Sequence, residues 1–284
     1  MSEWGGVRGK RVLITGATNG IGLAAAAELA RRGAQLAIVA RSEAKAAAAV
    51  DRIGGNAVDV LKGDLTSQES VRAIAAEALE RYPRIDVLVN NAGAVFEKRE
   101  LTADGLERTW ALNHVAPFLL TELLLDRLKA SAPARIVTTS SDAHKGAEIP
   151  WDDLNAERSY GQRGFRRYGQ TKLANILFTV ELARRLQGSG VTANCFHPGV
   201  VSTGFNRNNS AFMRAAMAVI RPFSRSPEKG AETLVWLVES EEAGGENGGY
   251  FVDCQRAQPD PPARDLEAAR RLWEITEQQV TAHA

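Results

Sequence analysis

Tyr168 is the one tyrosine of the chain's four that has a lysine, Lys172, four positions further on. Residues four apart on a helix share one face, so a phenol and an ammonium would lie one turn apart. A free tyrosine has a pKa of about 10, and a nearby ammonium favours the phenolate and lowers that pKa. Such a phenol can exchange a proton with the oxygen of an alcohol or carbonyl group. The pair therefore predicts acid–base chemistry at Tyr168, and a purely structural Tyr–Lys pair is the alternative.

Ser141 follows a predicted strand, at the carboxyl edge where open α/β sheets bind their ligands. Its hydroxyl can hydrogen-bond a substrate oxygen and stabilise the charge that grows there. Ser140 is the rival candidate, because adjacent strand residues face opposite sides of a sheet. A serine that only ends the strand is the other alternative.

Asn113 lies four residues before Pro117, inside a helical pattern. Because proline has no N–H, the carbonyl of Asn113 loses its helical partner and the helix is expected to kink. A freed carbonyl can hold a water within reach of Lys172. We therefore predict a proton relay from solvent through this water and Lys172 to Tyr168; a kink that serves packing alone is the alternative.

A glycine-rich turn follows the first apolar run and opens an Ala-rich helical pattern. Glycine allows a tight turn and a close approach of the backbone to a pyrophosphate, whose charge the helix N-terminus favours. The spacing is G-x-x-x-G-x-G, not the commoner G-x-G-x-x-G. The turn residues predicted to contact a dinucleotide are Thr15, Gly16, Thr18, Asn19, Gly20, Ile21 and Gly22.

The second predicted strand ends in Ala40-Arg41-Ser42. An acidic residue at this point would bind the ribose of NAD and repel a 2′-phosphate. Arg41 can instead pair with that phosphate, and Ser42 can supply a second donor. NADP is therefore the favoured cofactor, and NAD is the alternative.

The elements that position these residues alternate between apolar runs and helical patterns, which is typical of a parallel sheet. Strands are expected at 11–14, 35–40, 57–60, 85–89, 135–139, 191–196 and 250–252. Helices are expected at 23–32, 43–52, 68–81, 106–129, 168–186, 227–239 and from about 263 to 280. The chain is thus predicted to form one α/β domain, residues 1–284, with a Rossmann-type doubly wound sheet of about seven parallel strands and helices on both faces.

Composition narrows the function classes. Lys and Arg number 35 against 34 Asp and Glu, which gives no support for a nucleic-acid binder. The first ten residues lack the apolar core of a signal peptide, and no apolar run of about 18 residues predicts a membrane span. The two cysteines and four histidines have no metal-ligand spacing, so no metal site is expected. We expect a cytoplasmic protein.

Four motifs together resemble the short-chain dehydrogenase/reductase family over nearly the whole chain. They are the T-G-x-x-x-G-x-G turn, the run Asn90-Asn91-Ala92-Gly93, the Tyr168–Lys172 pair, and the loop from Pro198 to Thr203. The Ser-Ser-x-Ala-His run at 140–144, the long gap before Tyr168 and the sequence Lys-Leu-Ala-Asn at 172–175 are similar to the retinol dehydrogenase branch. Many members of that branch have an N-terminal membrane anchor, which is not expected here and argues against a retinoid substrate.

The resemblance implies an oxidoreductase that interconverts an alcohol and a carbonyl compound with Asn113, Ser141, Tyr168 and Lys172 as its catalytic group. It also implies that Lys172 holds the nicotinamide ribose. Further implied cofactor contacts are Asp64 and Leu65 at the adenine, Asn91, Ala92 and Gly93 along the adenosine ribose and backbone, Tyr168, and Pro198, Gly199, Val201 and Thr203 at the nicotinamide.

The segment 204–226 follows the nicotinamide loop and is predicted to cover the substrate. Its phenylalanines and methionines suit a bulky apolar alcohol, aldehyde or ketone, with Trp151 and Phe165 as the opposite wall. Core packing or a dimer contact is the alternative for all of these residues. The apolar lid residues are Phe205, Phe212, Met213, Met217, Val219, Ile220 and Phe223.

Arg207, Arg214 and Arg221 recur every seven residues, so a basic helical face over 207–221 can contact an anionic membrane surface. Solvated arginines are the alternative. The family resemblance implies a homodimer or a tetramer. A non-catalytic NADP-sensing or scaffold protein is the alternative function, which loss of Tyr168 or Lys172 would have favoured.

Overall fold

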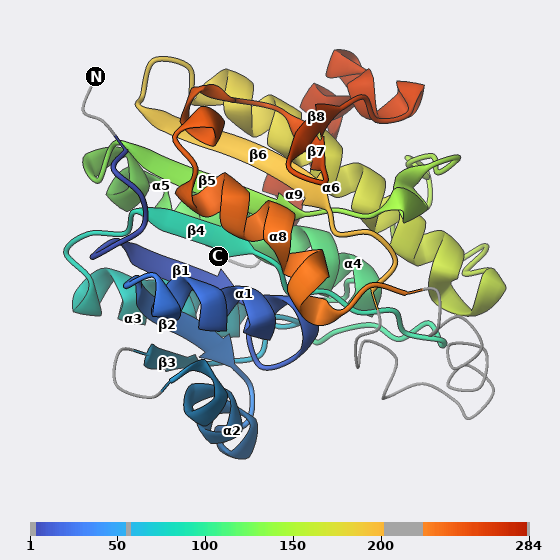
Figure 1. The fold of residues 1–284 in the computed structure, drawn as a ribbon. Helices are drawn as coiled ribbons and strands as arrows, with labels where there is room; N and C mark the ends of the chain where they lie inside the picture. The colour runs from blue at the N-terminus through green and yellow to red at the C-terminus, as the bar shows by residue number, and fades with distance from the viewer. Residues whose placement is uncertain (1–3, 55–57, 202–223, 283–284) are drawn as a thin grey trace.

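One mixed sheet of eight strands forms the centre of the protein (Figure 1). The computed structural model describes residues 4–54, 58–201 and 224–282. The strand order is β3-β2-β1-β4-β5-β6-β7-β8, in which β1 to β7 are parallel and β8 is antiparallel to β7. The strands are β1 (Arg11–Thr15), β2 (Gln35–Ala40), β3 (Val58–Lys62), β4 (Val87–Asn90), β5 (Ala134–Thr139), β6 (Val191–His197), β7 (Tyr250–Val252) and β8 (Gln255–Ala257).

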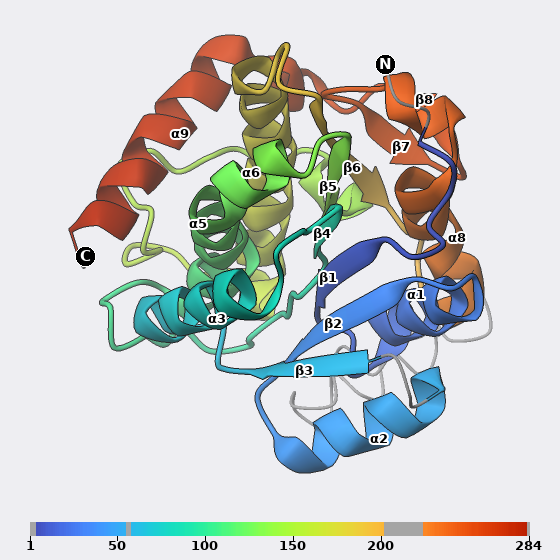
Figure 2. The same ribbon diagram turned by 90° about the vertical axis from the view of Figure 1, so that its left-hand side faces the viewer.

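Helices cover both faces of the sheet, as a doubly wound fold requires (Figure 2). One face carries α1 (Gly20–Arg31) and α8 (Pro227–Glu239), while α2 (Glu43–Ile53) lies beside β2 and β3. The helices of the other face are α3 (Gln68–Arg81), α5 (Ala116–Ala130), α6 (Phe165–Arg185) and α9 (Leu266–Thr281). None of the described helices is both long enough and apolar enough to cross a bilayer. The predicted Rossmann-type architecture is confirmed.

The central strands are buried on both faces, which explains why they read as continuous apolar runs. All residues of β4 and β5 are buried. Side chains alternate along a strand, so Val12 and Ile14 of β1 belong to the core beneath α1 and α8, whereas Leu13 belongs to the core beneath α5 and α6. Two apolar layers therefore hold the sheet between the helices.

The eighth strand, β8, differs from the expected count of about seven. It returns from β7 through a two-residue turn, since Val252 pairs with Gln255. Asp253 and Cys254 form that turn with φ values of 51° and 60°. Such turns usually contain Asn or Gly, and the polar β8 has no apolar alternation, so the sequence gives little indication of this hairpin.

The last helix also differs from its expected start near residue 263. Pro261–Arg264 form a short 3-10 turn, and α9 begins only at Leu266. The carboxylate of Asp265 accepts hydrogen bonds from the backbone N–H groups of Glu267 and Ala268. This side-chain cap fixes the first turn of α9.

The helix expected over 106–129 contains a π-helical turn. It consists of α4 (Arg108–Trp110), the π turn Ala111–Val115 and then α5. The backbone N–H of Ala116 donates to the carbonyl of Ala111, five residues back. The wider turn lies next to Pro117, which lacks an N–H, so the helix continues through the position where we expected a kink.

Candidate active site

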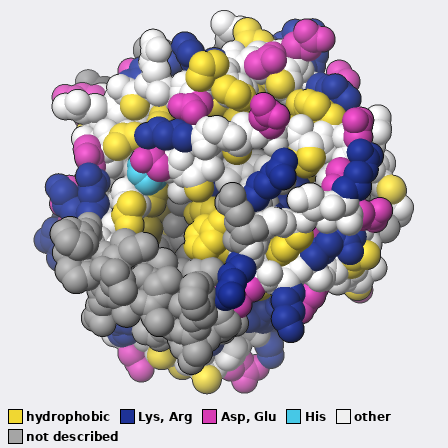
Figure 3. Space-filling model, turned by 90° about the vertical axis from the view of Figure 1, so that its right-hand side faces the viewer, with side chains coloured by type: hydrophobic (Ala, Val, Ile, Leu, Met, Phe, Trp, Pro, Cys, Tyr) yellow, Lys and Arg dark blue, Asp and Glu magenta, His cyan; other side chains and the backbone are white. Residues whose placement is uncertain are grey.

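The carboxyl ends of β1, β4, β5 and β6 meet at one edge of the sheet, and most predicted site residues lie on the segments that leave it. Figure 3 looks onto this edge, where hydrophobic side chains gather around a hollow. The glycine turn follows β1, Gly93 lies after β4, Ser141 after β5 and Pro198 after β6. The fold thus brings together residues that are more than 180 positions apart in the chain.

Tyr168 and Lys172 lie on the same face of α6, as their spacing predicts. The Lys172 ammonium is 5.3 Å from the centroid of the Tyr168 ring. Lys172 is fully buried, and its ammonium donates a hydrogen bond of 3.0 Å to the carbonyl of Thr139 at the end of β5. Burial lowers the pKa of Lys172 to about 8. The ammonium is therefore held in the interior, beside the phenol ring.

Tyr168 differs from expectation in its acidity. Burial raises the pKa of Tyr168 to about 12, although a hydrogen bond with Ser141 acts in the opposite direction. We expected the ammonium of Lys172 to lower this pKa. Desolvation penalises the charged phenolate, and in this structure it outweighs the hydrogen bond with Ser141. Tyr168 therefore keeps its proton at neutral pH.

The two adjacent serines after β5 face different partners. Ser140 is buried, and its hydroxyl donates to the backbone carbonyl of Lys172 at 2.8 Å. Ser141 is only half-buried, interacts with the hydroxyl of Tyr168 and accepts a hydrogen bond from the backbone N–H of Ala143. Ser140 thus ties β5 to α6, whereas Ser141 faces the phenol.

Asn113 lies in the π turn and is completely buried. Its side-chain amide pairs with both backbone groups of Ala94, at 2.9 Å and 3.0 Å, and also donates to the hydroxyl of Thr171. A Cβ atom added to Gly93 would lie 3.3 Å from Asn113 Oδ1 and 3.4 Å from Lys172 Nζ. The side chain of Asn113 therefore fixes the segment after β4 next to the ammonium of Lys172.

The glycine turn is shaped by contacts with the segment after β4. The Asn91 side chain donates to the carbonyls of Thr15 and Gly16, and the Thr15 hydroxyl accepts from the backbone N–H groups of Asn91 and Ala92. Gly16 has a φ of 70°, and a Cβ on Gly22 would lie only 2.4 Å from the Gly16 carbonyl oxygen. Both positions therefore require glycine.

The N-terminus of α1 suits a bound pyrophosphate. Asn19 occupies the N-cap position, but its side chain makes no capping hydrogen bond. No acidic residue lies in the first turn of this 12-residue helix. The first backbone N–H groups therefore keep their capacity to bind an anion. Thr18, Gly20 and Ile21 lie on the same turn, where they were predicted.

The residues predicted at the adenosine end lie where β2 and β3 finish. Arg41 Nη1 is 3.6 Å from Asp64 Oδ2, and the Arg41 side chain is 54% exposed. Burial alone would raise the pKa of Asp64, but hydrogen bonds from Thr66 and the charge of Arg41 hold it below its ordinary value. Ser42 precedes α2, and Leu65 packs against the core. The exposed guanidinium fits a phosphate ligand.

The loop after β6 is tied back to the start of α8. Gly199 has a φ of 80°, and Val201 forms an isolated bridge with Arg225, whose N–H donates to the Val200 carbonyl at 2.7 Å. A Cβ on Gly230 of α8 would lie 2.6 Å from Val201. The predictions for Thr203, for the lid residues 204–223 and for the arginines at 207–221 lie outside the described residues.

The two residues proposed for the opposite wall have different surroundings. Trp151 packs against the hydrophobic core, and the guanidinium of Arg271 lies 4.5 Å from its ring centroid. The indole is thus engaged in packing, the alternative that we considered. Phe165, at the start of α6, is 38% exposed.

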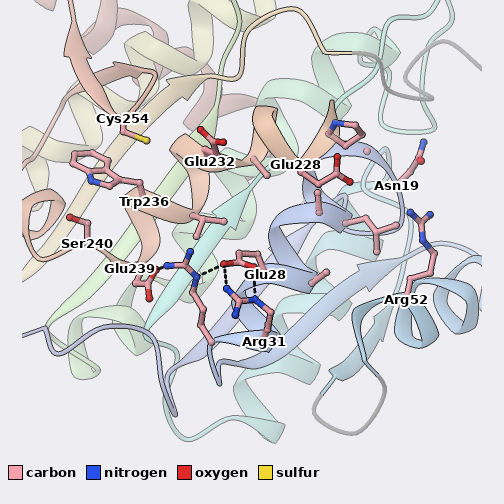
Figure 4. A pocket seen from close by; sticks show the side chains of 18 residues that line it. Asn19, Glu28, Arg31, Arg52, Glu228, Glu232, Trp236, Glu239, Ser240 and Cys254 are labelled. Atoms are coloured by element: carbon pink, nitrogen blue, oxygen red, sulfur yellow. Dashed lines mark hydrogen bonds and ion pairs between the residues drawn. The ribbon is translucent and has the colours of Figure 1, made fainter. Parts of the chain in front are cut away.

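A groove of about 1010 Å³ runs between α1 and α8 (Figure 4). Of the predicted site residues, it is lined by Asn19 and Gly20. Three of its charged side chains form one cluster, in which Glu28 accepts hydrogen bonds from Arg31 and Arg32 at 2.7 Å and 2.6 Å. Tyr168 and Lys172 are not among the residues that line this groove, and an ion pair between Arg32 and Glu239 links α1 to α8.

Two histidines to which the sequence analysis gave no role lie beside Ser141. His144 Nδ1 is 2.7 Å from the carbonyl oxygen of Ser141, and His197 Nδ1 accepts from the backbone N–H of Asp142 at 3.1 Å. His197 also lines a cavity of about 530 Å³ at the ends of β6 and β7, together with Val200. In the sequence, His144 lies shortly after Ser140-Ser141 and His197 directly precedes Pro198-Gly199. This proximity to two predicted site motifs could have indicated a role for both histidines.

Comparisons with known proteins identify the family of this chain. The short chain dehydrogenase family model matches residues 10–153. Retinol dehydrogenase 14 of Mus musculus is 43% identical over 96% of this chain and 86% of its own length. Retinol dehydrogenase 13 of Homo sapiens is 43% identical over 94% of this chain and 83% of its own length.

Solved structures show the same fold. An uncharacterized protein from Mycobacterium paratuberculosis aligns with a TM-score of 0.79 and 32% identity, over 99% of this chain and 98% of its own. A short chain dehydrogenase from Burkholderia cenocepacia, in complex with NADP, aligns with a TM-score of 0.69 and 28% identity, over 86% of this chain and 96% of its own. The chain therefore belongs to the short-chain dehydrogenase family, in its retinol dehydrogenase-like branch.

Proposed function

We propose that this protein interconverts a bulky apolar alcohol and its carbonyl compound with NADP(H), using Tyr168 as the proton donor and acceptor. Members of the family are NAD(P)-binding oxidoreductases that act on alcohol and carbonyl groups. The observation that carries the proposal is the cluster at the end of β5, where the Tyr168 phenol meets Ser141 and has the Lys172 ammonium 5.3 Å from its ring.

The cofactor would be held along the carboxyl edge of the sheet. The first turn of α1 would bind the pyrophosphate, Arg41 the 2′-phosphate, and Lys172 the nicotinamide ribose. The half-exposed guanidinium of Arg41 and the uncapped first turn of α1 support this assignment. The bound nicotinamide supplies or accepts the hydride.

Ser141 would hydrogen-bond the substrate oxygen and hold it against the Tyr168 hydroxyl. During carbonyl reduction Tyr168 donates its proton to that oxygen, and the ammonium of Lys172 stabilises the phenolate that forms. A phenol with a pKa of about 12 is protonated at neutral pH, so Tyr168 can donate this proton during reduction. A water on the Asn113 carbonyl would return the proton from solvent through Lys172.

The substrate is proposed to be apolar and large. The relatives named retinol dehydrogenase support an alcohol of that class. Phe165, three residues before Tyr168, and Val200, two residues after Pro198, are large apolar side chains that remain exposed. Exposed apolar surface next to a polar reacting group is typical of a site for an apolar ligand.

The test is an absorbance assay at the nicotinamide band, with NADPH and a panel of apolar aldehydes, ketones, retinoids and steroids. Consumption of NADPH with at least one carbonyl compound, and its loss in Tyr168→Phe, is the expected result. NADPH binding without turnover of any compound would overturn the proposal in favour of a sensor or scaffold.

A further inference from the structure

The peptide group that joins Ser141 to Asp142 has both of its polar atoms bound by histidine side chains. Its carbonyl oxygen, on Ser141, lies 2.7 Å from His144 Nδ1. Its N–H, on Asp142, donates to His197 Nδ1 at 3.1 Å. His144 lies in the turn directly after Ser141, whereas His197 ends β6. One histidine therefore acts locally and the other reaches across from the neighbouring strand.

The partners fix a different tautomer in each ring. A backbone N–H can only donate, so His197 Nδ1 must be the unprotonated nitrogen and Nε2 must carry the hydrogen. His197 Nε2 then lies 3.5 Å from Asp142 Oδ2. In His144 the roles are reversed, because Nε2 accepts from the backbone N–H of Asp260 at 3.3 Å. His144 Nδ1 consequently carries the hydrogen and donates it to the Ser141 carbonyl.

Both rings are held rigidly. His144 is 1% exposed and His197 is 6% exposed. The ring of His144 packs edge-on against Tyr250, with their centroids 5.2 Å apart. Buried side chains with satisfied hydrogen bonds can hold a neighbouring group within the narrow range of positions that catalysis requires.

We propose that His144 and His197 are positioning residues, which clamp the Ser141–Asp142 peptide and so direct the Ser141 hydroxyl toward Tyr168. This inference rests on the proposed function, because it gives Ser141 the substrate oxygen as its ligand. Rotation of the peptide would break both histidine hydrogen bonds. The clamp therefore restricts the backbone torsion of Ser141 and keeps its hydroxyl on the side of the phenol.

The clamp works only while His197 is neutral. Protonation would place a hydrogen on His197 Nδ1, opposite the N–H of Asp142, and the bond would be lost. Burial lowers the pKa of His197, although the charge of Asp142 acts to raise it. The clamp is therefore intact at neutral pH and opens in acid. Among the described residues, the charged and titratable groups around His197 are Asp142, His144 and Lys145 after β5, Arg225 before α8, Asp253 in the β7–β8 turn and Tyr250 on β7.

The first test needs no turnover. Long-range ¹H–¹⁵N spectra of histidine-labelled protein at neutral pH are expected to show His197 as the Nε2–H tautomer and His144 as the Nδ1–H tautomer. A protonated His197, or the opposite tautomer in either ring, would overturn the clamp. This result is independent of the proposed function, which fails separately if the wild-type protein consumes no NADPH with any carbonyl compound.

The second test separates the hydrogen bond from the packing. His197→Leu removes the acceptor and is expected to lower kcat by about 100-fold, with little change in NADPH affinity. His197→Asn keeps an acceptor near the Nδ1 position, so it is expected to recover most of that loss and to remove the acid decline of kcat. His144→Leu likewise removes the donor to the Ser141 carbonyl, whereas His144→Asn keeps a donor, so the same loss and recovery of kcat are expected. Full activity in the Leu variants, or equal losses in Leu and Asn, would overturn the inference.

Asp142→Asn is the matched control. It leaves the clamped backbone N–H in place, so kcat at neutral pH is expected to change by about twofold or less. The lost carboxylate no longer raises the pKa of His197, and the acid decline of kcat is therefore expected to move to lower pH. A decline that stays where it is in wild type would exclude His197 as its source.

Discussion

Arg167 Nε and Glu107 Oε2 lie 2.7 Å apart, and both side chains are fully buried. Arg167 is the residue directly before Tyr168 in the chain. The same carboxylate accepts hydrogen bonds from the backbone N–H groups of Thr109 and Trp110. The guanidinium of Arg167 also donates to the carbonyl of Leu154 and lies 4.7 Å from the centroid of the Trp110 ring. This ion pair thus joins the start of α6 to the helix that carries Asn113.

Breaking this pair is expected to destabilise the fold. Glu107→Gln leaves the buried charge of Arg167 uncompensated, which typically costs about 3–5 kcal/mol. Glu100→Gln removes a carboxylate that pairs with Arg108 at 2.5 Å but is 53% exposed, so its cost is expected to be below about 1 kcal/mol. Chemical denaturation of both variants measures the difference. Similar free energies of unfolding would show that the buried pair contributes little.

Tyr168→Phe is expected to lower turnover by at least about 10²–10⁴-fold, since it removes the proton that general acid catalysis supplies. NADPH binding, measured by fluorescence titration, is expected to stay close to wild type. Tyr82→Phe is the control, because the Tyr82 ring lies 4.4 Å from the Arg11 guanidinium at the start of β1, at the opposite edge of the sheet. Turnover retained in Tyr168→Phe would remove the proton-transfer role.

The charge of the Lys172 ammonium is expected to set the upper pH limit for carbonyl reduction. Burial lowers the pKa of Lys172 to about 8, so the side chain is charged below that pH and becomes neutral above it. For carbonyl reduction, kcat/KM for NADPH is therefore expected to be level near neutral pH and to fall about tenfold per pH unit above 8. Lys172→Arg keeps its charge throughout this range and is expected to abolish the decline. A decline that persists in Lys172→Arg would assign it to another group.

Much of the fold is readable from local patterns. The helices 68–81 and 227–239 have the predicted bounds, because a serine side chain caps each of them: Ser67 accepts from Ser70 N–H, and Ser226 accepts from Lys229 N–H. The four-residue spacing of Tyr168 and Lys172 likewise predicted that both side chains lie on one face of α6. These features depend on residues that are neighbours in sequence.

Features that depend on tertiary contacts were not predictable. Glu107 and Arg167 are 60 positions apart, and neither stands out as buried in the sequence. For Asn113 the sequence drew attention to the carbonyl, whereas the structure engages the side chain with Ala94 and Thr171. The pKa of Tyr168 is raised and not lowered as we expected, for the same reason. Desolvation depends on the atoms packed around the phenol, which the sequence does not reveal.

Arg41→Asp is expected to change the cofactor preference. The guanidinium at the end of β2 is half-exposed, and its one ion pair within the described part of the chain is the 3.6 Å contact with Asp64, so it can accept a 2′-phosphate as its partner. A charge-assisted hydrogen bond contributes about 1.5–3 kcal/mol, and NADPH affinity is therefore expected to fall about 10–100-fold while NADH affinity is kept or rises. Dissociation constants for both nucleotides, measured by fluorescence titration, give the ratio. Lys129→Asp makes the same change in net charge at the C-terminal end of α5 and is expected to leave that ratio unchanged. An equal loss for both nucleotides in Arg41→Asp would mean that Arg41 does not recognise the phosphate that distinguishes them.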